Sequence, residues 1–225
     1  MRYPLLGAAL LLLAATPAQA AEVTELTTQQ QKLGYTIGLQ IGQGLKRDGL
    51  NLDADALAQA VKDVYAGRSS RLTAEERQAV LQVVREEQNK KQAAAAVSAM
   101  ETGKKFLAEN AKKEGVTQTP SGLQYKVIKA GAGKQPTKDD TVVAHYRGTL
   151  INGTEFDSSF TRGEPASFPV GGVIPGWQEV LQLMKEGARW QVFIPSELAY
   201  AERGAGDVIG PNETLIFEIE LLTVK

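Results

Sequence analysis

The residues that could form a functional site in this chain are mostly aromatic and aliphatic, with few polar groups among them. Residues 173–177, Val-Ile-Pro-Gly-Trp, place two β-branched residues, a proline, a glycine and a tryptophan in a row. Tyr146 and the segment 156–159, Phe-Asp-Ser-Ser, lie upstream, and aromatic residues recur at 198–200 and 215–217. We expect an apolar pocket with one carboxylate and a few hydroxyls, as is typical of a binding site. No nucleophile paired with a base accompanies these segments, so the pattern does not indicate covalent catalysis.

Two other features that could carry chemistry are interpreted as structural. His145 is the single histidine, has no cysteine or serine partner pattern and lies in a predicted strand, so we assign it no role. Residues 131–134, Gly-Ala-Gly-Lys, look like part of a phosphate-binding loop. Gln135 stands where that loop needs serine or threonine, so we expect a turn. The sequence predicts neither a metal nor a cofactor.

The composition and the first residues indicate an exported protein. Residues 1–20 combine Arg2, an apolar run and an Ala-Gln-Ala site, which predicts a cleaved secretory signal peptide and a periplasmic or secreted protein. No other segment is long and apolar enough for a membrane helix. The mature chain would carry 24 basic and 26 acidic residues, and this net charge of −2 argues against nucleic acid as a partner. Because the sequence has no cysteine, we expect neither a disulfide nor a lipid anchor on an N-terminal cysteine.

The mature sequence divides by composition into a helical part and a strand-rich part. Residues 21–114 are rich in Ala, Gln, Glu and Lys and contain no proline, whereas 115–225 contain seven prolines. Three capping signals predict the starts of helices: Thr27 with Gln30, Asp53, and Thr73 with Glu76. We therefore expect a helical dimerisation domain at 21–72 and a long connecting helix at 73–114.

The connecting helix is too long for one small domain. No proline interrupts it before Gly115, so its length would be about 40 residues, or about 60 Å. Glutamates at 86 and 87 precede lysines at 90 and 91 by four residues, a spacing that supports an exposed helix. A solvated rod between two packed ends fits this composition, with Gly103 as the point where it could bend.

The first helix carries a glycine every fourth residue on one face. These are Gly34, Gly38 and Gly42, with Ile37 and Ile41 beside them. Each glycine costs about 1 kcal/mol relative to alanine inside a helix, so close approach of another helix has to offset that cost. The partner is either a second copy of the chain or another helix of the same chain, and the glycines alone do not decide. Two short helices bury too little surface to be stable alone, and a homodimer of intertwined helices would solve this.

The second part of the chain is expected to form strands around one short helix. The predicted strands lie at 123–128, 142–146, 190–194 and 215–221, with a hairpin turn at Asn152-Gly153 and an amphipathic helix from Trp177 to Met184. One helix on an antiparallel sheet is an α+β arrangement.

These motifs closely resemble the FK506-binding-protein family of peptidyl-prolyl cis–trans isomerases over residues 116–225. The resemblance is carried by Gly-Leu-Gln-Tyr-Lys-Val at 122–127, Val-Ile-Pro-Gly-Trp at 173–177 and Gly-Pro-Asn-Glu-Thr-Leu-Ile-Phe at 210–217. With the helical arm, the chain looks most like the exported macrophage-infectivity-potentiator-type members. The resemblance implies an isomerase domain at 115–225, built as a half-barrel sheet wrapped on a short helix, and a V-shaped homodimer.

The resemblance also implies site residues. The catalytic set is Asp157, Tyr146, Tyr200, Phe156, Trp177 and Ile174, and the substrate-binding set is Val173, Phe217, Arg162, Ile209 and Phe168. Trp177 would form the floor of the pocket, beneath the prolyl ring. The Ile174 backbone N–H and the Tyr200 hydroxyl would bind substrate carbonyls. Asp157 would lie beside the twisting carbonyl, held by a tyrosine and an arginine.

Isomerisation breaks no bond. The X–Pro amide rotates slowly because resonance gives it partial double-bond character and a barrier of about 18–20 kcal/mol. The twisted amide has less charge separation, so a dry apolar pocket favours it more than an acid or a base would.

The chain departs from the small single-domain members at four positions. Ala166 and Leu198 stand where those members have aromatic residues, Ala201 where they usually have glycine, and Ala205 where they often have histidine. The floor and walls are retained. The resemblance therefore implies proline-containing exported proteins as clients and binding of FK506- or rapamycin-like macrolides.

A chaperone or holdase that binds non-native chains in the dimer cleft is the alternative function. Taken singly, each aromatic residue is more often part of a core, and Asp157 is as well explained as a turn former. Taken as an ordered set of about ten positions, these residues favour the isomerase.

Overall fold

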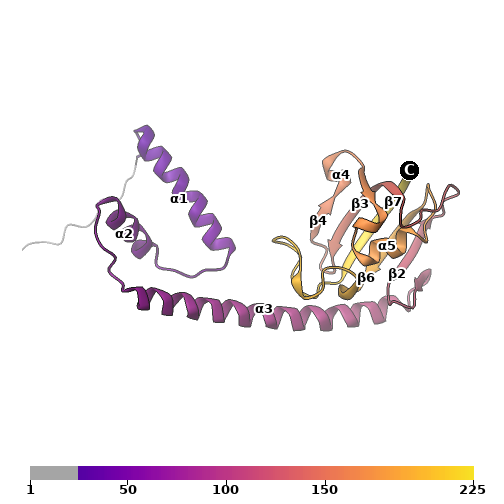
Figure 1. Ribbon diagram of the computed structural model, residues 1–225, viewed down its shortest axis with the longest axis horizontal. Helices are drawn as coiled ribbons and strands as arrows, with labels where there is room; N and C mark the ends of the chain where they lie inside the picture. The colour runs from indigo at the N-terminus through magenta and orange to yellow at the C-terminus, as the bar shows by residue number, and fades with distance from the viewer. Residues whose placement is uncertain (1–24) are drawn as a thin grey trace, which may run out of the picture. The chain divides into compact units, whose positions relative to one another are not determined.

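The structure of the protein, a computed structural model, describes residues 25–225, so the predicted signal peptide at 1–20 lies outside the described residues. The chain divides into two compact units, the second of which begins at Thr73. Within the described residues the first unit holds two helices, and the second holds a long helix and a seven-stranded sheet (Figure 1). None of the helices in residues 25–225 is long and apolar enough to cross a membrane.

Helix α1 (Gln29–Arg47) begins one residue later than its predicted capping box. Its N-cap is Thr28, whose hydroxyl accepts the Gln31 N–H (3.2 Å), while Gln31 Oε1 accepts the Thr28 N–H (2.9 Å). The prediction of Thr27 with Gln30 was therefore wrong by one residue. Thr27 also donates its N–H to Gln31 Oε1 (3.0 Å), so this register satisfies two backbone donors with one side chain.

Helix α2 (Ala54–Tyr65) begins at the predicted N-cap, Asp53. The turn that follows α2 is held by Asp63, whose side chain is 9% exposed. Asp63 accepts hydrogen bonds from Arg71 Nε (2.7 Å) and Arg68 Nη1 (3.1 Å). Mainly because of the bond from Arg71, the pKa of Asp63 is lowered to about 2.

Helix α3 (Ala74–Asn110) begins at the predicted capping box of Thr73 with Glu76 and runs for 37 residues, or about 55 Å. Residues 74–95 are exposed apart from Val84. From there on, buried and half-buried residues recur at 96, 99, 100, 103, 106, 107 and 110, which is the spacing of one helical face. This face packs on the rest of the second unit.

Two sequence-based interpretations of α3 are corrected by this packing. The helix was expected to be a solvated rod between two packed ends, but its first half is exposed apart from Val84 and the packed face begins only at Ala96. Gly103 was treated as a point of bending, but the helix continues through it and the glycine is buried. Further along, Phe106 packs against Phe193 of the sheet with ring centroids 5.9 Å apart. The small and apolar residue types in this half of the helix are therefore explained by packing on the rest of the second unit.

The sheet of the second unit is antiparallel in every pairing. Its strands are β1 (Val116–Gln118), β2 (Gln124–Lys129), β3 (Thr141–Leu150), β4 (Glu155–Ser158), β5 (Ala166–Pro169), β6 (Arg189–Ile194) and β7 (Leu215–Val224). The order is β1-β2-β6-β7-β3-β4, and β5 also pairs with β3. Short helical segments connect them: α4 (Ser159–Arg162), η1 (Val170–Gly172), α5 (Pro175–Leu181), η2 (Ser196–Leu198) and η3 (Ala201–Arg203).

Helix α5 packs its apolar face on the sheet and forms the centre of the core (Figure 1). It begins two residues before the predicted start, because Pro175 lacks an N–H and suits the first helical position. Val180 and Leu181 are fully buried, and so is Met184 in the turn that follows. Each such side chain contributes about 1.5–3 kcal/mol relative to leaving it exposed. The core therefore fixes the position of the segment that precedes α5, which lines the site.

Candidate active site

A pocket of about 370 Å³ opens between α5 and the sheet. Its lining residues come from six parts of the second unit: Tyr146 of β3, Asp157 of β4, Phe168 of β5, then Gly172, Val173, Ile174 and Trp177 around the start of α5, Tyr200 between η2 and η3, and Phe217 of β7. The structure thus brings together eight residues that the sequence analysis named. Gly172 was missed, because a glycine contributes no side chain from which its place could be inferred.

Trp177 lies at the base of the pocket and is 4% exposed. Three aromatic rings meet it edge-on: Tyr146 (centroids 5.4 Å apart), Phe168 (5.4 Å) and Phe217 (5.3 Å). Such edge-to-face pairs contribute about 0.5–1.5 kcal/mol each beyond the area they bury. The indole is therefore held rigidly as an apolar floor.

The start of α5 fixes the backbone at the rim of this floor. The Ile174 carbonyl accepts the N–H groups of Trp177 (2.9 Å) and Gln178 (3.0 Å), which ties the rim into the first helical turn. Gln178 Nε2 donates to the Val173 carbonyl (2.7 Å). At Gly176 an added Cβ would lie 2.5 Å from Ile194 Cγ2, so a glycine is needed for α5 to lie this close to the sheet.

The single carboxylate of the pocket is held by a tyrosine and an arginine. The Tyr146 hydroxyl donates to Asp157 Oδ2 (2.5 Å), and Arg162 Nη1 donates to Asp157 Oδ1. Arg162 Nη2 also donates to the Tyr146 hydroxyl (2.7 Å), which closes a ring of three polar groups. Arg162 is the last residue of α4 and supports Asp157 from outside the pocket lining.

These contacts fix the charge of each group. Burial raises the pKa of Asp157, but hydrogen bonds from Tyr146 and Arg162 outweigh it and leave the pKa below its ordinary value. Burial, with the hydrogen bond to Asp157, raises the pKa of Tyr146. Hydrogen bonds to Tyr146 and Asp157 raise the pKa of Arg162. At neutral pH the ring of three polar groups therefore consists of a carboxylate, a neutral phenol and, outside the pocket lining, a guanidinium.

Two of the predicted site residues lie behind the pocket. Phe156 packs edge-on against Phe217 with centroids 5.5 Å apart, and Ile209 is buried in the core. Neither residue lines the pocket, and Phe156 supports its wall through Phe217. His145, to which the sequence analysis gave no role, stacks on Phe160 and lies 3.0 Å from Ser159 Oγ. In residues 25–225 no group of His, Cys, Asp and Glu side chains is placed to hold a metal ion.

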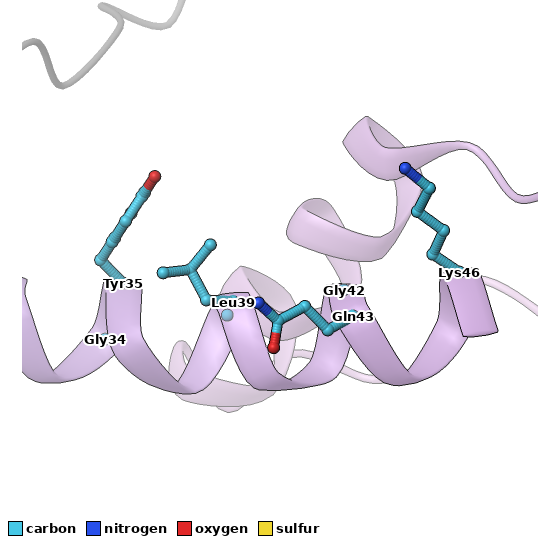
Figure 2. A pocket seen from close by; sticks show the side chains of 7 residues that line it. Gly34, Tyr35, Leu39, Gly42, Gln43 and Lys46 are labelled. Carbon is cyan, nitrogen blue, oxygen red and sulfur yellow. The ribbon is translucent and has the colours of Figure 1, made fainter. Parts of the chain in front are cut away.

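The glycine face of α1 is a second candidate site. A shallow hollow of about 520 Å³ lies along it, lined by Gly34, Tyr35, Gly38, Leu39, Gly42, Gln43 and Lys46. Figure 2 shows the side chains of Tyr35, Leu39 and Lys46 extending away from the helix on one side. Apart from the adjacent backbone of α1 itself, no atom of residues 25–225 lies within 4 Å of a Cβ built on any of the three glycines. The predicted Ile37 and Ile41 are each 48% exposed and lie outside the hollow.

Comparisons with known proteins agree with this architecture. The chain matches the family model of the FKBP-type peptidyl-prolyl cis-trans isomerase over residues 132–222, and that of the domain amino terminal to FKBP-type peptidyl-prolyl isomerase over residues 30–127. It is 45% identical to outer membrane protein MIP of Legionella longbeachae over 230 residues, which cover 100% of this chain and 99% of that protein. It is 48% identical to an FKBP-type 22 kDa peptidyl-prolyl cis-trans isomerase of Escherichia coli over 200 residues, covering 88% and 96% of the two chains.

A solved structure extends the similarity to the arrangement of the elements. The crystal structure of FkpA from Escherichia coli matches with a TM-score of 0.66 and 40% identity, over 89% of this chain and 99% of that one. Because identity at this level covers nearly the whole chain, the protein belongs to the FKBP-type peptidyl-prolyl cis-trans isomerase family.

Proposed function

We propose that the protein is a peptidyl-prolyl cis–trans isomerase that accelerates the folding of exported proteins. The observation that carries this proposal is the Trp177 pocket, in which an aromatic floor lies beside one carboxylate held by Tyr146 and Arg162. Family membership supports the same activity. The pocket suits a reaction that needs a shaped apolar surface and no proton transfer.

The catalytic effect is assigned to stabilisation of the twisted amide. A prolyl ring seated on Trp177 places the rotating bond beside Asp157, between the aromatic walls. When the nitrogen lone pair is uncoupled, the carbonyl carbon becomes more electron-poor, and a fixed carboxylate nearby stabilises it. The Ile174 N–H and the Tyr200 hydroxyl orient the flanking carbonyls. Every 1.4 kcal/mol or so removed from the barrier raises the rate about tenfold.

The test is prolyl isomerisation by the mature chain, 21–225, compared with Asp157→Leu. We expect the substitution to lower kcat/KM by about tenfold or more while far-UV circular dichroism stays unchanged, because the carboxylate of the ring is lost. Asp139→Leu, at an exposed turn aspartate away from the pocket, is the matched control. A folded wild type that does not accelerate isomerisation would overturn the proposal.

We propose further that α1 pairs with α1 of a second copy through its glycine face, so that residues 21–72 act as a dimerisation domain and 73–114 as a connecting segment. The glycines have no neighbour within the described chain, and no residue of α1 is buried. A face of this kind accepts another helix at short distance. Light scattering on the mature chain tests this, and a monomer at micromolar concentration would contradict it.

A chaperone function is the second candidate, and the exposed apolar side chains of the helices favour it. Val80, Leu81 and Val83 on α3 are each more than half exposed, as are Val64 and Tyr65 on α2. Such side chains can hold non-native chains. If Asp157→Leu still suppresses aggregation of an unfolded protein, the two functions are separable.

Export and drug binding complete the proposal. We expect cleavage after residue 20 and a periplasmic or secreted location, which N-terminal sequencing of the protein from the cell envelope would test. FK506- or rapamycin-like macrolides should compete for the Trp177 pocket and quench its fluorescence. No macrolide effect on Trp177→Phe would be expected.

A further inference from the structure

A chain of hydrogen bonds joins α3 to the rim of the pocket. Asn212 is 7% exposed and lies in the segment 210–214, which leads into β7. Its side-chain Nδ2 donates to the Ala96 carbonyl of α3 (3.4 Å), and its backbone N–H donates to the Ala201 carbonyl (2.8 Å). Ala201 directly follows Tyr200, which lines the pocket. The segment that precedes β7 thus contacts both the long helix and the residue next to Tyr200.

The backbone is left-handed at both ends of the Asn212–Ala201 hydrogen bond. The φ angles are 59° at Asn212 and 49° at Ala201, and in residues 25–225 these are the non-glycine residues with positive φ. Asparagine tolerates this conformation, whereas for alanine it costs about 1–2 kcal/mol. Strained residues persist where surrounding contacts hold them, and they gather near functional sites. The bond from Asn212 is a contact that holds Ala201.

The same segment is fixed to α3 at a second point. A Cβ built on Gly103 would lie 2.4 Å from Thr214 Oγ1, so the helix approaches this closely because position 103 is a glycine. Thr214 is 2% exposed. Ala96 and Gly103 are seven residues apart, so both contacts lie on one face of the helix.

We propose that Asn212 is a positioning residue for the isomerase site, through which α3 sets the direction of Tyr200. This rests on the proposed function. Helix α3 holds the Asn212 side chain, the Asn212 N–H holds Ala201, and the fixed backbone at Ala201 directs the neighbouring Tyr200 hydroxyl toward the substrate carbonyl. When the link to α3 is lost, Tyr200 samples several directions and the substrate binds more weakly.

The first test compares two variants of the mature chain that break the link differently. Asn212→Gly keeps the left-handed backbone but removes the side-chain amide. Gly103→Ala forces α3 away from Thr214, and adding Thr214→Ala to it removes the clashing hydroxyl and should restore the contact. We expect each single variant to raise KM for a proline tetrapeptide by about fivefold with a smaller change in kcat, as for one lost substrate hydrogen bond. Thr102→Ala, exposed on α3, is the control.

A cycle with Tyr200→Phe separates positioning from general destabilisation. If Asn212 acts through the Tyr200 hydroxyl, Asn212→Gly has no further effect on KM in the Tyr200→Phe background. An equal loss in both backgrounds would overturn the proposal.

Hydrogen exchange gives a readout that is independent of activity. We expect amides of residues 200–212 to exchange faster in Asn212→Gly and Gly103→Ala than in wild type or Thr102→Ala. Unchanged exchange would show that α3 does not hold this segment and would overturn the inference. An inactive wild type would overturn the proposed function instead, and the exchange result would still decide whether the link to α3 exists.

Discussion

Glycines in the two units of the chain have opposite surroundings. In the second unit, a Cβ at Gly176 would lie 2.5 Å from Ile194, and the reason for the glycine is present within the same chain. In α1, a Cβ at Gly34, Gly38 or Gly42 would meet no atom within 4 Å in the described part of the chain beyond the adjacent helix backbone. Apolar side chains differ in the same way, because α5 buries its apolar face and α1 has no buried residue. The pocket is lined by residues of one chain, whereas within residues 25–225 nothing packs on the glycine face of α1, and this difference is the basis of the proposed dimer.

The largest effect that this comparison predicts is for Trp177→Ala. Removing this buried indole from between three aromatic rings should lower the free energy of unfolding by about 3–5 kcal/mol and abolish isomerase activity. Urea unfolding followed by circular dichroism measures it. Tyr65→Ala removes an exposed aromatic side chain of α2 and should change the same quantity by less than about 0.5 kcal/mol. A large loss at Tyr65 would mean that its face is also covered, and the contrast between the units would fail.

Gly38→Ala is expected to change the thermal stability by less, and the sign of that change shows whether a second helix lies against the glycine face. In an unpartnered helix the substitution should stabilise α1 by about 1 kcal/mol. If a second helix lies against the glycine face, the added Cβ should instead weaken association, which is the outcome we expect. Thermal unfolding at several protein concentrations distinguishes the two, with Gln40→Ala as the control on α1. A raised, concentration-independent Tm would contradict the dimer.

The sequence indicated an apolar pocket because its aromatic residues lie in short motifs, and the resemblance to a known family identified the site residues within them. Tyr146, Asp157 and Trp177 were each named before the structure placed them around one cavity. The contacts of α3 could not be inferred, because Asn212 and Ala96 are 116 residues apart and no local pattern pairs them. Gly103 was misinterpreted for the same reason, since a glycine that bends a helix and one that admits a neighbour look alike in sequence.

One departure noted in the sequence gains a physical reason from the structure. Ala201 stands where glycine is usual in the small single-domain members, and its φ of 49° is a conformation that glycine adopts without strain. An alanine thus occupies a backbone conformation that suits glycine. Sequence alone shows the replacement but not the strain.

A carboxylate held by arginine occurs in each unit, and the two should respond differently to acid. The pKa of Asp63 is about 2, below its ordinary value of 3.8, so the charged form is favoured by folding. Its stabilising contribution is therefore complete above about pH 4 and is lost as the pH falls through about 2. Exchange of amides 67–72 should accelerate in that range. Asp63→Asn should exchange rapidly at every pH, and an acid response that persists in this variant would contradict the assignment to Asp63.

The smallest expected effect is at Asp157, where isomerase activity should not change with pH from about 8 to 5. Burial raises the pKa of this carboxyl, but the hydrogen bonds from Tyr146 and Arg162 lower it further, so the net pKa is below 3.8. A depressed pKa keeps the carboxylate charged until the pH falls below that value, and no other step of the proposed reaction moves a proton. The measurement is kcat/KM across this range, for wild type and for His145→Gln, which removes the single histidine of the sequence. An inflection that persists in His145→Gln would mean that a pocket group titrates, and would contradict catalysis by a permanently charged, apolar-walled site.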